Sequence, residues 1–387
     1  MNWKKFLYVL VLIILTIFSI WSYFRNIPSE IFNWNLDSEN IKQSKIYFGA
    51  FPALAEVYKT KETVFNINEI KNINDKSDYD KKLRSKLTEL MQIPFTPLIN
   101  PERDVLEQID KGKYFQKKIR LYTSHLTFTY GYLLVPKDIK FPAPGIIAMH
   151  QHGGFYENGK EEVVGNKGNP DLFYGKELAE RGYVVFVIDS PLFGENSETT
   201  TENSRNVSEQ FSVQTALNLG YSPLGIILQE DISALNYLYN LNNIDKNNIG
   251  CIGHSFGGVR CMYLSALDNR IKATVISSSV ANLKPNYNTG ILHTWLTLLP
   301  GASRYTETNG ILGLITPRPL MIFYTEKDPI FPLNEVKEQI ESLKLLYERL
   351  NQEFYFESIL ILNEAHAFPK EYHETAYKFL DKYLKSN

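Results

Sequence analysis

The stretch CIGHSFGGVR, residues 251–260, places Ser255 between Gly253 and Gly257 directly after the apolar run NNIGCI. Where a strand turns abruptly into a helix, the residue at the apex is strained and side chains two positions before and after it would collide. Glycine at both positions removes that collision. The hydroxyl of Ser255 would then be held at the carboxyl edge of a sheet, beside the positive end of a helix, where a nucleophile is useful.

A serine nucleophile needs a base, and the chain has seven histidines. Only His366 and His373 follow the last predicted core strand, whose carboxyl end would lie at the same sheet edge as Ser255. His366 stands in LNEAHAFP, the loop directly after that strand. His373 lies in the amphipathic run KEYHETAYKFLDKYL and is expected to be a solvated helix residue. We therefore predict His366 as the base.

The imidazole needs a carboxylate to orient it, normally from the loop after the sixth or seventh strand of such a sheet. The segment ISSSVANLKP, after the sixth predicted strand, offers none, so IFYTEKDPIFP after the seventh must supply it. Asp328 is preferred because Pro329 follows it and fixes the loop. Glu326 remains the alternative.

The oxyanion that forms on acyl attack needs two backbone N–H donors. One should be Phe256, the first residue of the helix, and the other should come from HQHGG, where His152 and Gly153 are both candidates. The pair His150-x-His152 could also be read as metal ligands. No carboxylate or third histidine follows at short spacing, and the sequence contains no H-E-x-x-H, so we expect neither a metal nor a cofactor.

These residues must be positioned by a sheet, and from residue 112 onward short apolar runs alternate with helix-length segments. Eight strands are expected, in YFQKKIRLYTS, LTFTYGYLLVP, PGIIAMH, GYVVFVIDS, NNIGCIG, IKATVISSS, RPLMIFYT and FYFESILIL. The first two should form a hairpin and the others a mostly parallel sheet with helices on both faces, an α/β fold. Residues 190–222 are too long for a plain connection and are expected to form a lid-like insertion.

The order of these features resembles that of the α/β-hydrolase superfamily. The segments HQHGG, GHSFGG, ITPRPLMIFYTEKDPIFP and EAHAFP are similar to the dienelactone hydrolase-like and acetyl xylan esterase-like branch, and the resemblance covers residues 112–385. It implies Ser255 as nucleophile, Asp328 as acid and His366 as base. The chain departs from the pattern at Gln151, where many relatives have glycine, and this departure concerns only the second oxyanion donor.

The N-terminal segment from Phe6 to Phe24 carries no charge and is long enough to span a bilayer. Two lysines precede it, which places the N-terminus in the cytoplasm. We expect residues 1–25 to form a cytoplasmic stub and transmembrane anchor, residues 26–111 a linker and N-terminal arm, and residues 112–387 an extracytoplasmic hydrolase domain at the cell membrane. Secretion after cleavage of the segment is the alternative.

The composition excludes other classes of protein. The chain has 387 residues, 44% of them hydrophobic, and a net charge of -2, which indicates a folded globular protein and no nucleic-acid partner. Cys251 and Cys261 flank Ser255, where buried free thiols are expected rather than a disulfide.

The expected function is that of a serine carboxylic ester hydrolase, acetyl esterase-like or dienelactone hydrolase-like, acting on small-molecule or carbohydrate esters. One alternative is a serine peptidase of the prolyl oligopeptidase type. Such enzymes usually carry a β-propeller, which the roughly 90 residues between anchor and hydrolase domain cannot form. The other alternative is a membrane-tethered binding protein that has lost activity.

Overall fold

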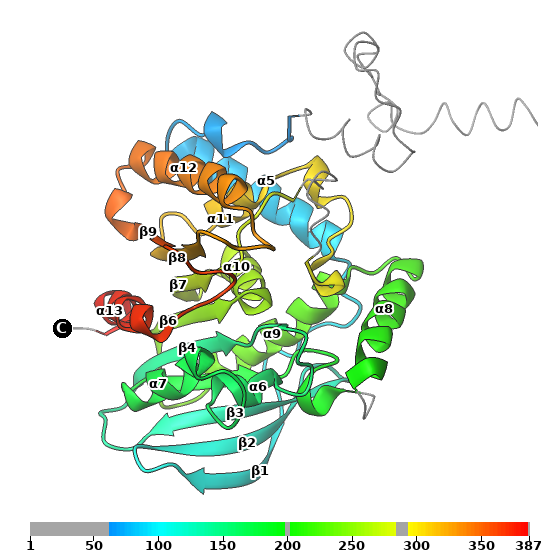
Figure 1. The fold of residues 1–387 in the computed structure, drawn as a ribbon, viewed down its shortest axis with the longest axis vertical. Helices are drawn as coiled ribbons and strands as arrows, with labels where there is room; N and C mark the ends of the chain where they lie inside the picture. Colours follow the sequence, from blue (N-terminus) through cyan, green and yellow to red (C-terminus); the bar gives the residue numbers. More distant parts are fainter. Residues whose placement is uncertain (1–61, 198–201, 284–292, 386–387) are drawn as a thin grey trace, which may run out of the picture. The chain divides into compact units, whose positions relative to one another are not determined.

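The computed structural model describes residues 62–197, 202–283 and 293–385. Within these ranges the chain builds a nine-stranded sheet in the order β1-β2-β3-β5-β4-β6-β7-β8-β9 (Figure 1). The strands are β1 Arg103–Asp110, β2 Tyr114–Tyr122, β3 Phe128–Pro136, β4 Ala143–Met149, β5 Val184–Ile188, β6 Ile244–His254, β7 Ile271–Ser277, β8 Leu320–Thr325 and β9 Phe356–Ile361.

The sheet changes from antiparallel to parallel along its width. Strands β1, β2 and β3 pair antiparallel, and β3 also pairs antiparallel with β5. All pairs from β5 through β4 to β9 are parallel, so the carboxyl ends of these strands meet at one edge. Each of the eight predicted strands is present, β2 and β3 form the predicted hairpin, and the α/β-hydrolase fold is confirmed.

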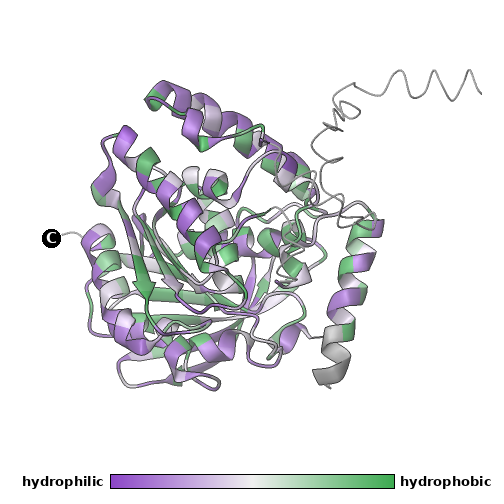
Figure 2. Ribbon diagram, turned by 45° about the horizontal axis from the view of Figure 1, so that its top comes forward, coloured by the Kyte–Doolittle hydropathy of each residue, from purple (hydrophilic) through white to green (hydrophobic). Residues whose placement is uncertain are grey.

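Helices cover both faces of the sheet. One face packs against α5 Ile73–Met91, α9 Pro223–Tyr239, α10 Phe256–Leu267, α11 Thr308–Gly313 and α12 Leu333–Arg349, which share one apolar core. The other face packs against α6 Gly159–Val163, α7 Tyr174–Glu180 and α13 His373–Leu384, around a second core. Figure 2 shows the apolar strands enclosed by helices of mixed hydropathy, as expected for a parallel sheet that is buried on both sides.

The expected number of eight strands was wrong by one, because β1 lies before residue 112 and pairs with β2. Most of β1 is exposed, since it is an edge strand with a single neighbour, and its polar sequence gives no alternating pattern. The helix α5, expected within the linker and arm, buries Leu83 and Leu87 in the apolar core, and Arg84 Nη2 donates to Leu314 O at 2.7 Å. The body of the fold therefore includes residues on both sides of the boundary expected at 112.

The expectation of free thiols was also wrong. Cys251 of β6 and Cys261 of α10 form a disulfide, and their Cα atoms lie 5.9 Å apart. The ten-residue spacing brings Cys261 to the side of α10 that packs back onto β6.

The predicted insertion, residues 190–222, contains the helix α8, Glu202–Asn218 (Figure 1). It packs against α9 and against the short 3₁₀ helix η4, Trp295–Thr297. The predicted membrane span, residues 6–24, lies outside the described part of the chain. Within the described ranges, no helix is both long and apolar enough to cross a bilayer.

Candidate active site

Ser255 stands between β6 and α10 with φ 56° and ψ -123°, in a backbone region that residues with a side chain rarely adopt. A Cβ atom on Gly253 would lie 2.3 Å from the Gly257 carbonyl oxygen, and one on Gly257 would lie 2.1 Å from the Met149 carbonyl oxygen. Both positions therefore require glycine, as predicted. The second glycine is crowded by β4, however, and not by the turn alone.

Ser255 belongs to a chain of three hydrogen-bonded side chains. His366 Nε2 lies 2.7 Å from Ser255 Oγ, and His366 Nδ1 lies 2.8 Å from Asp328 Oδ2. Because an ionised carboxylate can only accept, Nδ1 carries the ring proton and Nε2 accepts the hydroxyl proton of Ser255. The three residues follow β6, β8 and β9, so three loops distant in sequence meet at one edge of the sheet.

The Asp328 carboxylate is held from two sides. Its Oδ1 accepts from the backbone N–H groups of Ile330 and Phe331 at 2.8 and 3.0 Å, and its Oδ2 also accepts from Thr325 Oγ1 at 3.2 Å. Burial alone would raise the pKa of Asp328, but the hydrogen bonds and charge of His366 and the two backbone donors bring this pKa below its usual value. The carboxylate therefore stays ionised and fixes the orientation of His366.

The two alternative residues lie elsewhere. Glu326, the alternative acid, accepts from the backbone N–H of Asn363 at 2.9 Å. His373 is buried, and its Nδ1 lies 2.7 Å from Glu177 Oε2 on α7. The expectation of a solvated His373 was wrong, because this residue falls on the buried stripe of α13, one turn before Tyr377.

Two aromatic rings flank His366. The ring of Phe331 stacks on it with centroids 5.6 Å apart, and the ring of His254 lies 4.8 Å away. Burial, followed by the positive charge of His366, lowers the pKa of His254 well below its usual value. His254 therefore stays neutral beside the base and packs against it.

The two predicted sources of oxyanion donors, the first turn of α10 and the HQHGG loop, lie against each other. Phe256 is the first residue of α10, so its N–H has no acceptor within the helix. The HQHGG loop starts against α10, since the carbonyl oxygens of Met149 and His150 both border the Gly257 position. The N–H of Gly154 donates to His152 Nδ1 at 3.1 Å and is engaged there, whereas the predicted candidates His152 and Gly153 lie just before it.

Glu209 of α8 joins this loop to the rest of the site. Its side chain is 2% exposed, and its two oxygens accept four hydrogen bonds of 2.6–3.1 Å. The donors are His152 Nε2, Tyr156 OH, Thr294 Oγ1 and the backbone N–H of Trp295. Burial raises the pKa of Glu209, but the bonds from His152, Tyr156 and Thr294 lower it below its usual value. We call this arrangement the Glu209 clamp.

Sequence reasoning missed the Glu209 clamp. Glu209 lies in the polar run GENSETTTENSRNVSEQ, where no motif points to a carboxylate that binds the site, and its partners come from segments at least 53 residues away. No signal in the sequence could have identified it.

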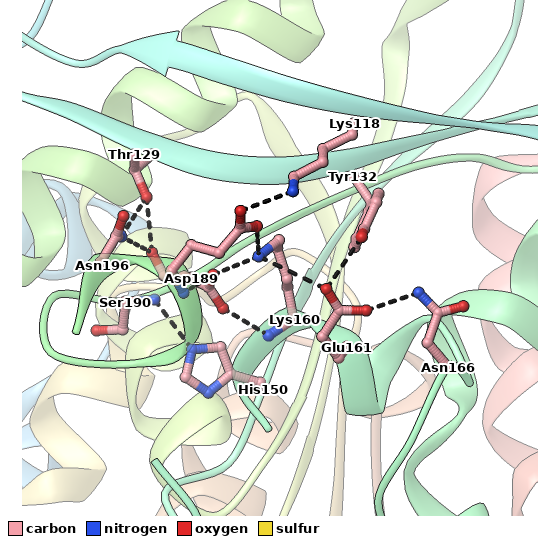
Figure 3. Close-up of polar contacts among 11 residues, drawn as sticks. Lys118, Thr129, Tyr132, His150, Lys160, Glu161, Asn166, Asp189, Ser190 and Asn196 are labelled. Carbon is pink, nitrogen blue, oxygen red and sulfur yellow. Dashed lines mark hydrogen bonds and ion pairs between the residues drawn. The ribbon is translucent and has the colours of Figure 1, made fainter. Parts of the chain in front are cut away.

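A buried charge network supports the loops after β4 and β5 (Figure 3). Asp189 accepts from the Lys160 ammonium and from the backbone N–H groups of Lys160 and Glu195, and Lys160 Nζ also binds Glu195 at 2.7 Å. His150 Nε2 accepts from the Ser190 N–H at 3.0 Å, so its Nδ1 carries the proton. Within the described residues, no group of three His, Cys, Asp or Glu side chains could hold a metal ion.

A sequence model of the Abhydrolase family matches residues 42–333, a range that includes Ser255 and Asp328. YtaP of Bacillus subtilis (strain 168), which is named as a hydrolase, is 28% identical to this chain over 220 residues. The matched region covers 56% of this chain and 71% of YtaP.

Among solved structures, a Bacteroides fragilis protein assigned as an acetyl xylan esterase superposes with a TM-score of 0.67 at 18% identity, covering 88% of this chain and 93% of its own. A glucuronoyl esterase from Solibacter usitatus superposes with a TM-score of 0.58 at 14% identity, covering 83% and 97%. At these identities the superpositions show a shared fold.

Proposed function

Because the chain belongs to the Abhydrolase family, we propose that it is a serine carboxylic ester hydrolase. One observation carries the proposal: the hydrogen-bonded chain from Ser255 through His366 to Asp328, with Ser255 on a strained turn at the N-terminus of α10. This arrangement suits acyl transfer, because the hydroxyl has a base within reach and the base has a fixed tautomer. The names of the fold relatives, acetyl xylan esterase and glucuronoyl esterase, agree with it.

In the proposed mechanism, Ser255 Oγ attacks the ester carbonyl carbon while His366 Nε2 takes the hydroxyl proton. The carbon–oxygen bond to the alcohol then breaks, and His366 returns the proton to the leaving oxygen. A water molecule attacks the acyl-enzyme, gives its proton to His366, and the acid leaves as Ser255 regains a proton. Asp328 remains ionised throughout and stabilises the imidazolium. The amide of Phe256 and one amide of His152 or Gly153 stabilise the oxyanion.

The acyl part of the proposed ester substrate is small. Next to Ser255, a compact apolar cluster fills the space between the HQHGG loop, α8, α9 and η4; its members are Tyr156, Leu192, Phe193, Val213, Ile227, Phe256 and Leu296. The rings of Tyr156 and Phe193 stack 5.0 Å apart, and Phe193 stacks on Phe256 at 6.0 Å. Such packing leaves more room for an acetyl group than for a long chain.

The location of the protein is part of the proposal. The uncharged apolar segment from residue 6 to residue 24 supports an N-terminal membrane anchor, and the two preceding lysines support an extracytoplasmic hydrolase domain. Membrane fractionation of cells that express the chain, with and without residues 1–25, tests this placement.

The experiment that tests the activity uses p-nitrophenyl acetate, butyrate and octanoate with the purified chain and with Ser255→Ala. We expect hydrolysis that is fastest with acetate and is lost in the variant. If the folded protein hydrolyses no ester, the esterase proposal fails. Hydrolysis of dipeptide p-nitroanilides would then support the peptidase alternative, and the absence of both activities would support a binding protein.

A further inference from the structure

His293 has an unused hydrogen-bond acceptor next to the site. Its Nε2 atom is buried and has no hydrogen-bond partner. A buried polar atom that lacks a partner destabilises the fold, so a bound group that supplies the missing hydrogen bond is favoured.

The neighbours of His293 define which proton this ring carries. Its Nδ1 lies 3.3 Å from Thr297 Oγ1, whose single hydroxyl proton is donated to the Thr294 carbonyl oxygen at 2.9 Å. Thr297 can therefore only accept from the ring, and Nδ1 must carry the proton. The Nε2 atom of His293 therefore carries no proton, and its lone pair can accept a hydrogen bond. Burial, followed by the charges of His366 and His152, lowers the pKa of His293 to about 3, so the ring stays neutral at ordinary pH.

The segment that carries His293 is bonded to the Glu209 clamp. Thr294 and Trp295 are both bound by the Glu209 clamp, which also holds the HQHGG loop through His152. The His293 ring packs edge-on against Phe331 at 5.0 Å, and Phe331 stacks on His366. His293 is thus linked to the base through Phe331, and its neighbour Thr294 is linked through Glu209 to the loop expected to supply the oxyanion donor.

The alcohol part of the ester must lie beside His366, because His366 gives its proton to the leaving oxygen. From His366, the ring contacts lead to Phe331 and then to His293. In the apolar cluster proposed above for the acyl side, the polar side-chain atom is Tyr156 OH, which already donates to Glu209 Oε2 at 2.6 Å.

We propose that His293 Nε2 accepts a hydrogen bond from a hydroxyl group on the alcohol part of the ester. The preferred substrates are then small acyl esters of polyhydroxylated alcohols, such as sugars. This inference rests on the proposed esterase function and specifies its substrate class.

The test compares three acetyl esters: p-nitrophenyl acetate, a monoacetylated methyl glycoside, and the same glycoside with its free hydroxyls methylated. For the wild-type chain, we expect methylation to lower kcat/KM about tenfold, which corresponds to a hydrogen bond of roughly 1.4 kcal/mol. In His293→Phe, which keeps the packing against Phe331, we expect that methylation penalty to disappear. Leu298→Ala, an exposed change in the same segment, should keep the penalty.

Several results would overturn the inference. One is a methylation penalty in His293→Phe as large as in the wild type. Another is an equal loss of kcat/KM on all three esters in His293→Phe, which indicates a structural role. A wild-type enzyme that hydrolyses p-nitrophenyl acetate but shows no methylation penalty rejects the inference and leaves the esterase proposal intact. Hydrolysis of no ester rejects both. If His293→Phe fails to fold, the wild-type penalty and His293→Gln still decide the matter.

An amide N–H could also donate to His293 Nε2. O-acetylserine amide, whose alcohol part carries N–H donors, distinguishes this source from a sugar hydroxyl. A dependence on His293 that appears only with this substrate would contradict the assignment to hydroxylated alcohols.

Discussion

At the scale of single residues, the choice between Asp328 and Glu326 can be tested in one loop. Asp328→Asn places an amide where Oδ2 accepts from His366, which favours the wrong imidazole tautomer, so kcat should fall about 10⁴-fold. Glu326→Gln is the matched control, because the Glu326 side chain accepts from the backbone N–H of Asn363 and not from His366. We expect its kcat to change less than about twofold, since a surface hydrogen bond contributes little. Steady-state ester hydrolysis measures both. Equal losses of kcat in the two variants would refute the assignment of Asp328 as the acid.

At the scale of elements, the turn between β6 and α10 depends on the closeness of β4. Gly257→Ala would place a Cβ atom 2.1 Å from Met149 O, so the strand or the helix must shift. We expect a loss of about 3 kcal/mol or more in the free energy of unfolding and loss of activity. Gly220→Ala is the control: Gly220 has φ +84°, but its Cβ would meet no atom within 4 Å, so a cost of about 1–2 kcal/mol is expected. Urea denaturation compares the two, and a smaller cost at Gly257 would contradict the crowding.

The Glu209 carboxylate bonds the helix α8 to the HQHGG loop and to the Thr294–Trp295 segment. Glu209→Gln replaces an acceptor oxygen with an NH₂ group that faces hydrogen-bond donors, so α8 and the HQHGG loop should loosen together. We expect kcat for acetate esters to fall about tenfold and amide hydrogen exchange in α8 to accelerate, while exchange in the sheet stays unchanged.

Gln214→Ala on an exposed position of α8 controls for general effects on that helix. If exchange in α8 is as slow in Glu209→Gln as in the control, the Glu209 clamp does not hold this helix.

At the scale of the whole molecule, buried charges set how stability depends on pH. Glu230 of α9 is buried, its Oε2 has no hydrogen-bond partner, and it neighbours the buried pair Asp231–Arg260. Burial, followed by the negative charge of Asp231, raises the pKa of Glu230 well above its usual value of 4.5. The folded state therefore keeps a proton that the unfolded state loses, and stability falls as the pH rises from 4.5 toward the folded-state pKa.

Glu230→Gln removes this dependence because the amide does not titrate. We expect the variant to gain stability relative to the wild type as the pH rises above the usual pKa of 4.5. The gain should be about 1.4 kcal/mol for each pH unit, until the pH reaches the folded-state pKa of Glu230. Thermal unfolding at several pH values measures the difference. A difference that does not change with pH would contradict the raised pKa.

The parts of the molecule that could be predicted are those whose signal is local in sequence. Ser255, Asp328 and His366 each follow a strand with an apolar run, so the eight strand segments and the loops that carry these residues were readable. The parts that could not be predicted depend on contacts between distant segments. The exposed edge strand β1 has no apolar alternation, and the acceptor role of His293 depends on Thr297 and on rings that come from other elements.

Covalent labelling shows whether Ser255 is the nucleophile that His366 activates. The chain is incubated with an alkyl fluorophosphonate, which reacts with activated serines, and the modified peptide is located by mass spectrometry. We expect one adduct per chain at Ser255, no adduct in Ser255→Ala, and labelling slowed at least about 100-fold in His366→Ala. A label on another residue, or ester hydrolysis that persists in Ser255→Ala, would contradict this role of Ser255.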